Sequence, residues 1–193
     1  MPQEHDPFNG LRKKLRSCTP RRVEAPFADQ ASVALVLVPS QGKGMEVLLI
    51  ERAQALEDPW SGQVALPGGR SEVADVDRLA TAIREAQEET GILLRREDFI
   101  GELDDLSPRT ATYPELAVRP FVFGLMAKPA TMPGPEAADC FWLELTAPRP
   151  AVCEAAFRIA GEDRVLPAFK AGPRTVWGIT YRILTSCLGL LEG

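Results

Sequence analysis

The segment LPGGRSEVADVDRLATAIREAQEETGIL (66–93) decides the fold, because it joins a glycine-rich turn to an amphipathic helix. Asp75 or Asp77 is placed to cap the helix at its N-terminus, where acidic side chains also favour the helix dipole. Gly91 stands where a left-handed residue ends many helices. Small and apolar residues recur at helical spacing and form one packing stripe: Leu79, Ala82, Ile83, Ala86 and Thr90. The segment therefore predicts a helix that packs along one side and ends at Gly91.

The same helix carries three carboxylates away from that stripe. Glu85, Glu88 and Glu89 are spaced i, i+3 and i+4, so at about 100° per residue they share one arc of the helix. Like charges at this spacing repel one another, whereas Mg²⁺ accepts carboxylates together with water and phosphate oxygens. The residue types alone leave two interpretations open, which are a solvated charged surface and a site for a hard divalent cation.

The turn and the helix together resemble the Nudix box, which is written G-x5-E-x7-R-E-U-x-E-E-x-G-U with U an aliphatic residue. The matching positions are Gly69, Arg84, Glu85, Ala86, Glu88, Glu89, Gly91 and Ile92. Residues 70–83 separate Gly69 from Arg84, which is one residue more than the general pattern, and Asp75 replaces the early Glu. The chain thus resembles the Nudix hydrolase family in a variant with a lengthened box.

The lengthened box and the preceding segment GQVALPGG (62–69) resemble the coenzyme A pyrophosphatase-like branch of this family. The likeness covers most of residues 31–190, and its specific motifs lie within 62–93. That branch usually shows an L-R-x-H-x pattern before the glycine segment, where this chain has Asp58 and Trp60 in place of Arg and His. The resemblance favours coenzyme A as the substrate, while this departure removes basic groups that would meet its phosphates.

The resemblance implies hydrolysis of a small-molecule nucleotide diphosphate linked to a further group, with Mg²⁺ or Mn²⁺ as the cofactor. Such ions neutralise diphosphate oxygens and lower the pKa of a bound water, which is the help that this reaction needs. The resemblance assigns metal binding to Glu85, Glu89, Glu88, the backbone carbonyl of Gly68, and Glu136. Glu136 would come from a late loop as ligand or base, and an ordinary turn residue is the equal alternative.

The catalytic assignments from the resemblance are Glu85, Glu88 and Arg84. Either Glu85 or Glu88 is a candidate general base, and the sequence does not choose between them. Arg84 is expected to orient the carboxylates through charge-assisted pairs rather than to touch the substrate.

Four residues are candidates for binding the substrate: Arg52, Trp60, Arg109 and Tyr113. Arg52 ends the strand 48–53, which matches the family. In the loop 107–115, Arg109 would meet phosphate and Tyr113 would stack on a base, with a solvated loop as the alternative. Trp60 would stack on adenine, with a core or hinge aromatic as the alternative.

The remaining pattern predicts an α/β Nudix fold, a mixed β-sheet sandwiched between helices (α/β/α). Strands are expected at 31–38, 45–53, 62–69, 99–103, 116–126 and 140–145. Residues 152–160 and 164–170 read as a strand pair or as partly helical, and 175–192 as a closing helix. We expect an N-terminal arm over 1–28 with a short amphipathic helix, followed by a Nudix domain over 29–193.

Composition narrows the class of protein. The 193 residues carry 22 Lys and Arg against 27 Asp and Glu, so the formal net charge of −5 disfavours a long nucleic acid as partner. No apolar run is long enough for a membrane span, and the N-terminus lacks a secretory signal. Four scattered cysteines predict free thiols in a reducing cytoplasm. The family resemblance adds the expectation of a homodimer.

Three functions remain in competition. The first is hydrolysis of coenzyme A or acyl-coenzyme A to a phosphopantetheine and adenosine 3′,5′-bisphosphate. The second is hydrolysis of ADP-ribose, a dinucleotide polyphosphate or a nucleoside triphosphate. The third is a Nudix-fold binding module without turnover, against which the intact carboxylates argue.

Overall fold

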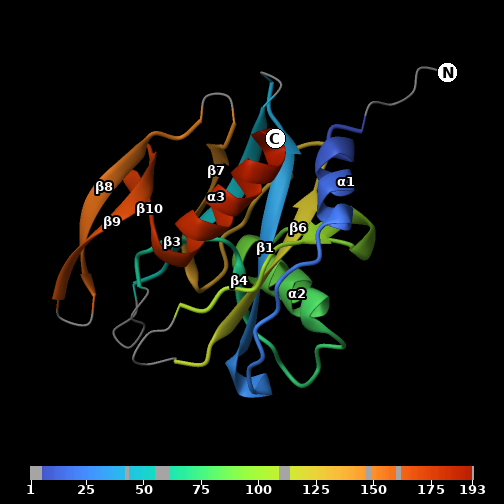
Figure 1. Cartoon of the computed structure of the whole chain (residues 1–193), viewed down its shortest axis with the longest axis horizontal. Helices are drawn as coiled ribbons and strands as arrows, with labels where there is room; N and C mark the ends of the chain where they lie inside the picture. The colour runs from blue at the N-terminus through green and yellow to red at the C-terminus, as the bar shows by residue number, and fades with distance from the viewer. Residues whose placement is uncertain are drawn as a thin grey trace.

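The computed structural model describes residues 6–41, 44–54, 61–108, 114–146, 149–159 and 162–192 (Figure 1). Its helices are α1 (Asn9–Ser17), α2 (Arg78–Thr90) and α3 (Gly178–Glu192), with short 3-10 turns at Phe27–Asp29 and Arg96–Asp98. Its strands are β1 (Gln30–Pro39), β2 (Met45–Arg52), β3 (Val64–Ala65), β4 (Gly68–Arg70), β5 (Phe99–Glu102), β6 (Ala117–Gly124), β7 (Ala137–Glu144), β8 (Val152–Ile159), β9 (Glu162–Ala171) and β10 (Arg174–Val176). Five of the six expected strands and the closing helix are present with changes of boundary, and the expected strand 62–69 is divided into β3 and β4.

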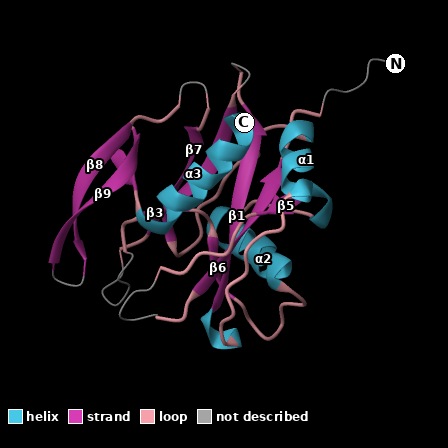
Figure 2. Cartoon of the chain, viewed as in Figure 1, coloured by secondary structure: helices cyan, strands magenta, loops and turns pink. Residues whose placement is uncertain are grey.

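The main sheet contains seven strands and is mixed (Figure 2). β1 runs parallel to β6, and its pairings with β2 and β4 are antiparallel. β2 pairs with β1 only near its start and with β3 near its end, while β7 follows its other edge. The segment from β3 to β4 therefore fills the space where β1 and β2 diverge, which places the glycine segment in the middle of the sheet.

Helices cover both faces of this sheet, which confirms the α/β/α prediction. α1 and α3 share one hydrophobic cluster with Leu35, Leu37 and Leu49 of the sheet. α2 packs on the opposite face, where Ala82 and Ala86 meet Ala34 and Val36. Neighbouring residues of β1 and β2 enter opposite clusters, as strand alternation requires for a sheet that is buried on both sides.

The glycine segment differs from the prediction. Residues 62–69 were expected to form one strand ending in a turn, but the structure has two short strands, and Gly68–Arg70 pairs with Ala31–Val33 of β1. A Cβ on Gly68 would lie 2.6 Å from Cα of Val33, so only glycine permits this close approach. The glycines therefore continue the sheet instead of leaving it as a loop.

A second, three-stranded sheet follows the order β10-β9-β8. Its β8–β9 hairpin confirms the strand-pair alternative for 152–160 and 164–170. The closing helix begins at Gly178 rather than at residue 175, because Arg174–Val176 pairs with β9 and Gly178 has a φ of 64°. This positive φ, which favours glycine, marks the change from strand to helix.

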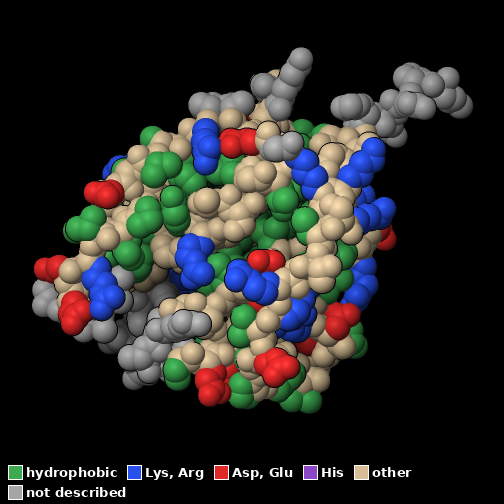
Figure 3. Space-filling model, in the orientation of Figure 1, with side chains coloured by type: hydrophobic (Ala, Val, Ile, Leu, Met, Phe, Trp, Pro, Cys, Tyr) green, Lys and Arg blue, Asp and Glu red, His purple; other side chains and the backbone are tan. Residues whose placement is uncertain are grey.

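The N-terminal segment contains the predicted amphipathic helix. Leu11 and Leu15 of α1 are buried in the cluster shared with α3, and Lys14 Nζ donates to the carbonyl of Leu190 at 2.7 Å. Lys and Arg side chains follow the edge where α1 lies, and elsewhere on that face they mix with acidic ones (Figure 3). Among the described helices, none is long and apolar enough to cross a membrane. All four cysteines are free thiols, as expected.

Candidate active site

The helix that carries the carboxylates begins and ends as predicted. The Asp77 carboxylate caps α2 by accepting from the backbone N–H of Ala80 at 2.8 Å, which settles the choice between Asp75 and Asp77. Gly91 ends the helix in the left-handed conformation with a φ of 72°. Because both ends are fixed and the packing stripe is buried on the sheet, α2 places Glu85 and Glu89 beside β4, and Glu89 also beside the end of β2.

Glu89 is a buried acid at the centre of the site, with 3 % of its surface exposed. Its Oε2 accepts a hydrogen bond from the backbone N–H of Gly68 at 2.8 Å. Its Oε1 has no hydrogen-bond partner among the described residues, and Arg52 Nη1 lies 3.7 Å away. Burial raises the pKa of Glu89 to about 7, against the opposing effects of the Gly68 hydrogen bond and the Arg52 charge. A buried carboxylate oxygen without a partner is costly, so its persistence points to a ligand that completes the site.

Arg84 holds the remaining carboxylates together, as predicted. Its Nη1 lies 2.9 Å from Glu85 Oε1 and 3.0 Å from Glu88 Oε2. Its Nε and Nη2 bind the two oxygens of Asp75, each at 3.1 Å, and Nη2 also donates to the carbonyl of Arg70. Hydrogen bonding to Arg84 is the main reason why the pKa of Asp75 falls to about 2. With its donors engaged in this way, Arg84 is a positioning residue rather than a group aimed at a substrate.

The sequence offers two roles for Asp75, a helix cap and the replacement of the early Glu of the Nudix box. Asp77 rather than Asp75 is the cap, and the Asp75 carboxylate instead forms a two-point pair with Arg84. The signal in the sequence is that Asp75 follows Gly69 by six positions, near the place of the early Glu. This spacing does not by itself reveal that Asp75 pairs with Arg84.

Glu85 and Glu136 belong to the same group of charges. A Cβ on Gly69 would lie 2.6 Å from Cδ of Glu85, so the absence of a side chain there makes room for that carboxylate. Burial chiefly raises the pKa of Glu85, and the charges of Glu88 and Glu136 raise it further against the opposing effect of Arg84. Glu136 also raises the pKa of Glu89. The late loop therefore brings its carboxylate into the field of the α2 glutamates.

Backbone hydrogen bonds fix the position of this late loop. The N–H of Gly134 donates to the carbonyl of Glu89 at 3.0 Å, and the N–H of Ala53 donates to the carbonyl of Glu136 at 2.9 Å. A Cβ on Gly134 would strike the carbonyl of Glu88, so the loop approaches α2 as closely as a glycine allows. Glu136 is thus tied both to α2 and to the end of β2.

The donor set suits a hard divalent cation. It consists of carboxylate and backbone oxygens, and it includes one buried oxygen with no hydrogen-bond partner in the described part of the chain. In the part of the chain that the structure describes, no three His, Cys, Asp or Glu side chains form a ready-made coordination group. Glu85 and Glu88 instead point to Arg84, whose single positive charge offsets only part of theirs. The residues fit a metal site that acts together with the oxygens of a bound substrate.

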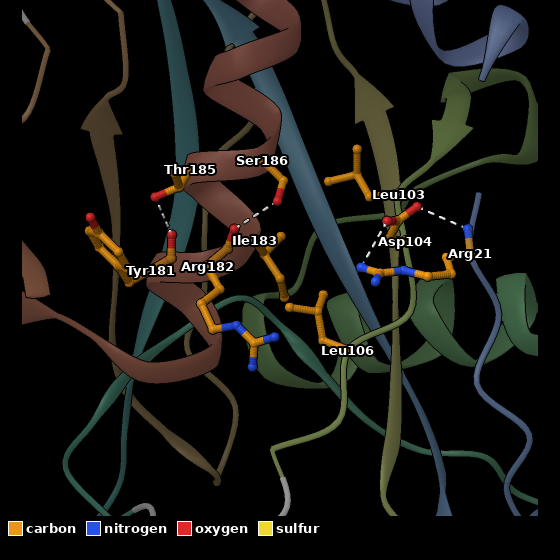
Figure 4. Close-up of a pocket in the computed structure, with 9 residues that line it drawn as sticks. All are labelled: Arg21, Leu103, Asp104, Leu106, Tyr181, Arg182, Ile183, Thr185 and Ser186. Atoms are coloured by element: carbon orange, nitrogen blue, oxygen red, sulfur yellow. Dashed lines mark hydrogen bonds and ion pairs between the residues drawn. The ribbon is translucent and has the colours of Figure 1, made fainter. Parts of the chain in front are cut away.

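Of the four candidate substrate-binding residues, Arg52 lies at the site, beside Glu89. Trp60, Arg109 and Tyr113 lie outside the described residues. A cavity of about 250 Å³ lies elsewhere, between α3 and the segment after β5 (Figure 4). Arg21, Asp104 and Arg182 line it, and no predicted site residue does. The carboxylate site is therefore separate from this cavity.

Known proteins resemble the chain in sequence and in fold. The family model of the NUDIX domain matches residues 28–161. The human mitochondrial coenzyme A diphosphatase NUDT8 is 31% identical over 188 residues, covering 93% of this chain and 76% of that protein. An uncharacterized Schizosaccharomyces pombe protein, C14C4.10c, is 42% identical over 88 residues, covering 44% of this chain. The crystal structure of a MutT/nudix family protein from Enterococcus faecalis matches with a TM-score of 0.59 and 18% identity, covering 94% of this chain and 68% of that one.

The family match and the α2 carboxylates agree on the same segment, and the chain belongs to the Nudix family. The match to the fission yeast protein spans 27% of that protein's length. A Nudix hydrolase NudL from Photorhabdus laumondii is likewise matched over 43% of its length. The chain thus spans less than half the length of these two relatives.

Proposed function

We propose that the protein is a divalent-metal-dependent hydrolase of the pyrophosphate bond in coenzyme A or acyl-coenzyme A, releasing a phosphopantetheine and adenosine 3′,5′-bisphosphate. The observation that carries this proposal is the buried Glu89, whose Oε1 has no hydrogen-bond partner among the described residues. Two further observations support the choice of substrate. They are the lengthened Nudix box with its segment 62–69, and the naming of the human relative as a coenzyme A diphosphatase.

The proposal gives each residue of the site a role. Glu85, Glu88, Glu89, the carbonyl of Gly68 and Glu136 would hold Mg²⁺ or Mn²⁺. When bound, the ion neutralises the diphosphate oxygens and polarises a water molecule. Glu85 or Glu88 is the candidate base for that water, with Glu136 as the alternative from the late loop. Arg84 keeps the carboxylates in place, and Arg52 compensates part of the charge of Glu89.

A second candidate substrate class is ADP-ribose, a dinucleotide polyphosphate or a nucleoside triphosphate. The observation that favours it is the pair Asp58 and Trp60, which stands where the coenzyme A branch has Arg and His. Both classes share a nucleoside diphosphate unit and would use the same carboxylate site, and coenzyme A differs by its ribose 3′-phosphate and by the group beyond the diphosphate.

The decisive experiment is a substrate panel with Mg²⁺ in H₂¹⁸O, with the products identified by mass. We expect coenzyme A to yield adenosine 3′,5′-bisphosphate and phosphopantetheine, with ¹⁸O on the phosphate that water attacks. Turnover of nucleoside substrates without turnover of coenzyme A would reject the first class and support the second. Loss of turnover in Glu85→Gln, with normal turnover in the control Glu97→Gln, would separate a carboxylate role from a general effect of charge, because Glu97 pairs with Arg95 outside the site.

We also propose a cytoplasmic homodimer, which rests on the family resemblance and on the cysteine pattern. The human relative is named as mitochondrial, and that location belongs to that protein. Light scattering during size-exclusion chromatography measures the mass directly, and a monomeric mass would contradict the dimer.

A further inference from the structure

The small sheet ends in an open edge. Its strand order is β10-β9-β8, and β8 lies at the outer end of the molecule (Figure 1). Along its eight residues, Val152–Ile159, β8 pairs with β9 on one side, and no other strand of the described chain pairs with it. Such an edge presents backbone N–H and C=O groups that can pair with a strand of another chain.

The register of the hairpin shows which backbone groups of β8 face the open edge. The N–H of Lys170 donates to the carbonyl of Ala151 at 2.9 Å, so these residues form a hydrogen-bonded pair just before β8. In an antiparallel ladder, hydrogen-bonded and non-hydrogen-bonded pairs alternate. Residues 153, 155 and 157 therefore bond to β9, whereas the N–H and C=O groups of residues 152, 154, 156 and 158 point away from it.

The outer edge of β9 is protected, whereas that of β8 is not. β10 pairs with β9 over Phe169–Ala171. The same alternation turns the backbone groups of Asp163, Val165 and Pro167 toward the part of this edge that lies beyond β10. Pro167 has no N–H and so interrupts pairing there. The sequence of β8 contains no proline, so its edge keeps both donors and acceptors.

One face of the hairpin is exposed and largely apolar beside this edge. Val152 and Val165 are 58% and 64% exposed. Ala156 is exposed as well, and it is the register partner of Val165. The other face is covered where the ring of Phe157 stacks on Trp177 with centroids 4.1 Å apart. Exposed apolar side chains next to an open edge are typical of an interaction surface.

The sequence of the edge is complementary to itself. When two copies of β8 pair antiparallel about a two-fold axis at Ala156, Glu154 of each copy faces position 158 of the other. The sequence has arginine at position 158, so both facing positions combine opposite formal charges, which stabilise a cross-strand pair. An axis at Glu154 would instead place two glutamates opposite each other.

The register centred on Ala156 also satisfies the other requirements of the edge. It pairs positions 154, 156 and 158, which are the ones whose backbone groups point away from β9. It places Ala156 of one copy beside Ala156 of the other, so the row that each forms with its own Val165 continues across the axis. Charge, hydrogen bonding and apolar contact thus favour one and the same register.

We propose that two copies of this chain associate through their β8 strands, antiparallel and centred on Ala156, and so join their two small sheets into one. The proposal rests on the homodimer proposed above and locates its interface. The partner is a second copy because the charges of the edge match those of the edge itself. Every contact described for the carboxylate site comes from one chain, so each copy keeps its own site.

The first test reverses the charges at the facing positions. Light scattering during size-exclusion chromatography gives the mass of the full-length protein over a range of concentrations, and we expect the mass of two chains for the wild type. Glu154→Arg and Arg158→Glu each place like charges at both facing positions, so each should raise the dissociation constant at least about 10-fold. The double variant Glu154→Arg/Arg158→Glu restores opposite charges and should restore the dimer.

The matched control is Lys170→Glu. It reverses an exposed charge in the same sheet, but on the central strand and away from the edge of β8, so it should leave the mass of two chains unchanged. Circular dichroism checks that each variant is folded. Loss of the dimer in both single variants without recovery in the folded double variant would overturn the proposed register.

A cysteine at the axis tests the register without changing charge. Residues of a hydrogen-bonded antiparallel pair have Cα atoms about 5.5 Å apart, which suits a disulfide. In a Cys18→Ser background, which removes the exposed native thiol, Ala156→Cys should form a linked dimer with oxidised glutathione. Val152→Cys is the control, because it lies on the same strand and face but about 27 Å from its counterpart, and it should not form a link.

The outcomes separate this interface from the proposals on which it rests. The mass of one chain at every concentration would reject the second copy and leave the edge to a strand of a different protein. A dimeric wild type that is insensitive to both charge reversals, with no link in Ala156→Cys, would reject this interface and leave the homodimer standing. Hydrolysis of coenzyme A is measured separately, and its absence would reject the proposed substrate without affecting the interface.

Discussion

The cluster of charged side chains around Glu89 and the cluster around Asp105 have opposite balances of charge. Around Glu89, the carboxylates outnumber the arginines, and one buried oxygen has no hydrogen-bond partner among the described residues. Around Asp105, the arginines outnumber the acid. Arg119 binds both oxygens of Asp105 at 2.8 and 2.9 Å, and Arg22 and Arg78 lie at 3.4 and 3.9 Å.

The pKa values follow this difference. Burial dominates at Glu89 and raises its pKa to about 7. Burial also acts to raise the pKa of Asp105, but hydrogen bonds from Arg119 and from the N–H of Val23 outweigh it, so that pKa is lowered. Asp105 therefore joins the N-terminal segment, the start of α2 and β6 into the fold, while Glu89 retains bonding capacity. The comparison teaches that a buried carboxylate with an unused oxygen, such as Glu89, indicates a ligand site. A buried carboxylate with both oxygens bound by arginine, such as Asp105, instead connects parts of the fold.

The largest expected effect is on catalysis, in a variant of Glu89. Glu89→Gln keeps the shape and removes the charge, so we expect kcat for coenzyme A to fall by about 10³-fold, equivalent to about 4 kcal/mol. The free energy of unfolding should not fall, because a neutral amide has a smaller desolvation cost than a carboxylate. Steady-state kinetics and urea unfolding at pH 8 measure the two quantities, and full activity in the variant would remove Glu89 from the metal site.

The next largest effect is on the free energy of unfolding, in a variant of Asp105. Asp105→Asn removes the acid that faces Arg119 and Arg78 and, within the described chain, leaves Arg22 paired with Glu102 alone. We therefore expect a loss of about 3 kcal/mol, the lower end for breaking a buried pair because Asn still accepts hydrogen bonds. Catalysis per folded molecule should change little. Urea unfolding is the measurement, and an unchanged midpoint would show that Asp105 does not join these segments.

Metal binding gives a smaller effect that distinguishes the clusters. At 100 times its Kd, Mg²⁺ or Mn²⁺ should stabilise the folded protein by about 2.7 kcal/mol. We expect this stabilisation to disappear in Glu89→Gln and to persist in Asp105→Asn. Thermal unfolding with the metal ion or with a chelator reads out the difference, and equal stabilisation of both variants would place the metal elsewhere.

Taken per pH unit, the smallest effect is the pH dependence of the metal-free protein. The pKa of Glu89 is higher in the folded state than in the unfolded state, so the folded state stays protonated up to a higher pH. Glu89 should therefore lower the free energy of unfolding as pH rises from about 4.5 to about 7. A lowered folded pKa has the opposite sign, so the contribution of Asp105 is present above about 3.8 and is lost as pH falls below it. Each slope stays below about 1.4 kcal/mol per pH unit, the limit for one proton. Chemical unfolding from pH 3 to 8 should show Glu89→Gln flattening only the neutral side and Asp105→Asn only the acid side.

The sequence predicted those features that depend on local periodicity. The boundaries of α2 follow from Asp77 and Gly91, and the hairpin of β1 and β2 follows from two apolar runs with a glycine turn between them. The carboxylate arc of Glu85, Glu88 and Glu89 needs only the helical repeat. The pairing of Arg84 with Glu85 and Glu88 was predictable for the same reason, since residues near in sequence become neighbours on a helix.

Features formed between distant segments were not predictable in this way. The pairing of Gly68–Arg70 with β1 replaced a predicted turn, because the space it fills arises only where β1 and β2 diverge. The strand Arg174–Val176 replaced the first turn of a predicted helix, because its partner β9 supplies hydrogen bonds that periodicity does not reveal. No local sequence pattern indicates that Arg174 pairs with Glu51 and Asp139.

By itself, the sequence determined the family resemblance, the layered fold and the helix face that carries the glutamates, because each depends on residue types at short, regular spacing. Only the tertiary structure decided which of those glutamates is buried and which of its oxygens has no hydrogen-bond partner among the described residues. Burial and pKa depend on the segments that cover a side chain, and here Gly68, Arg52 and Glu136 come from three separate parts of the chain.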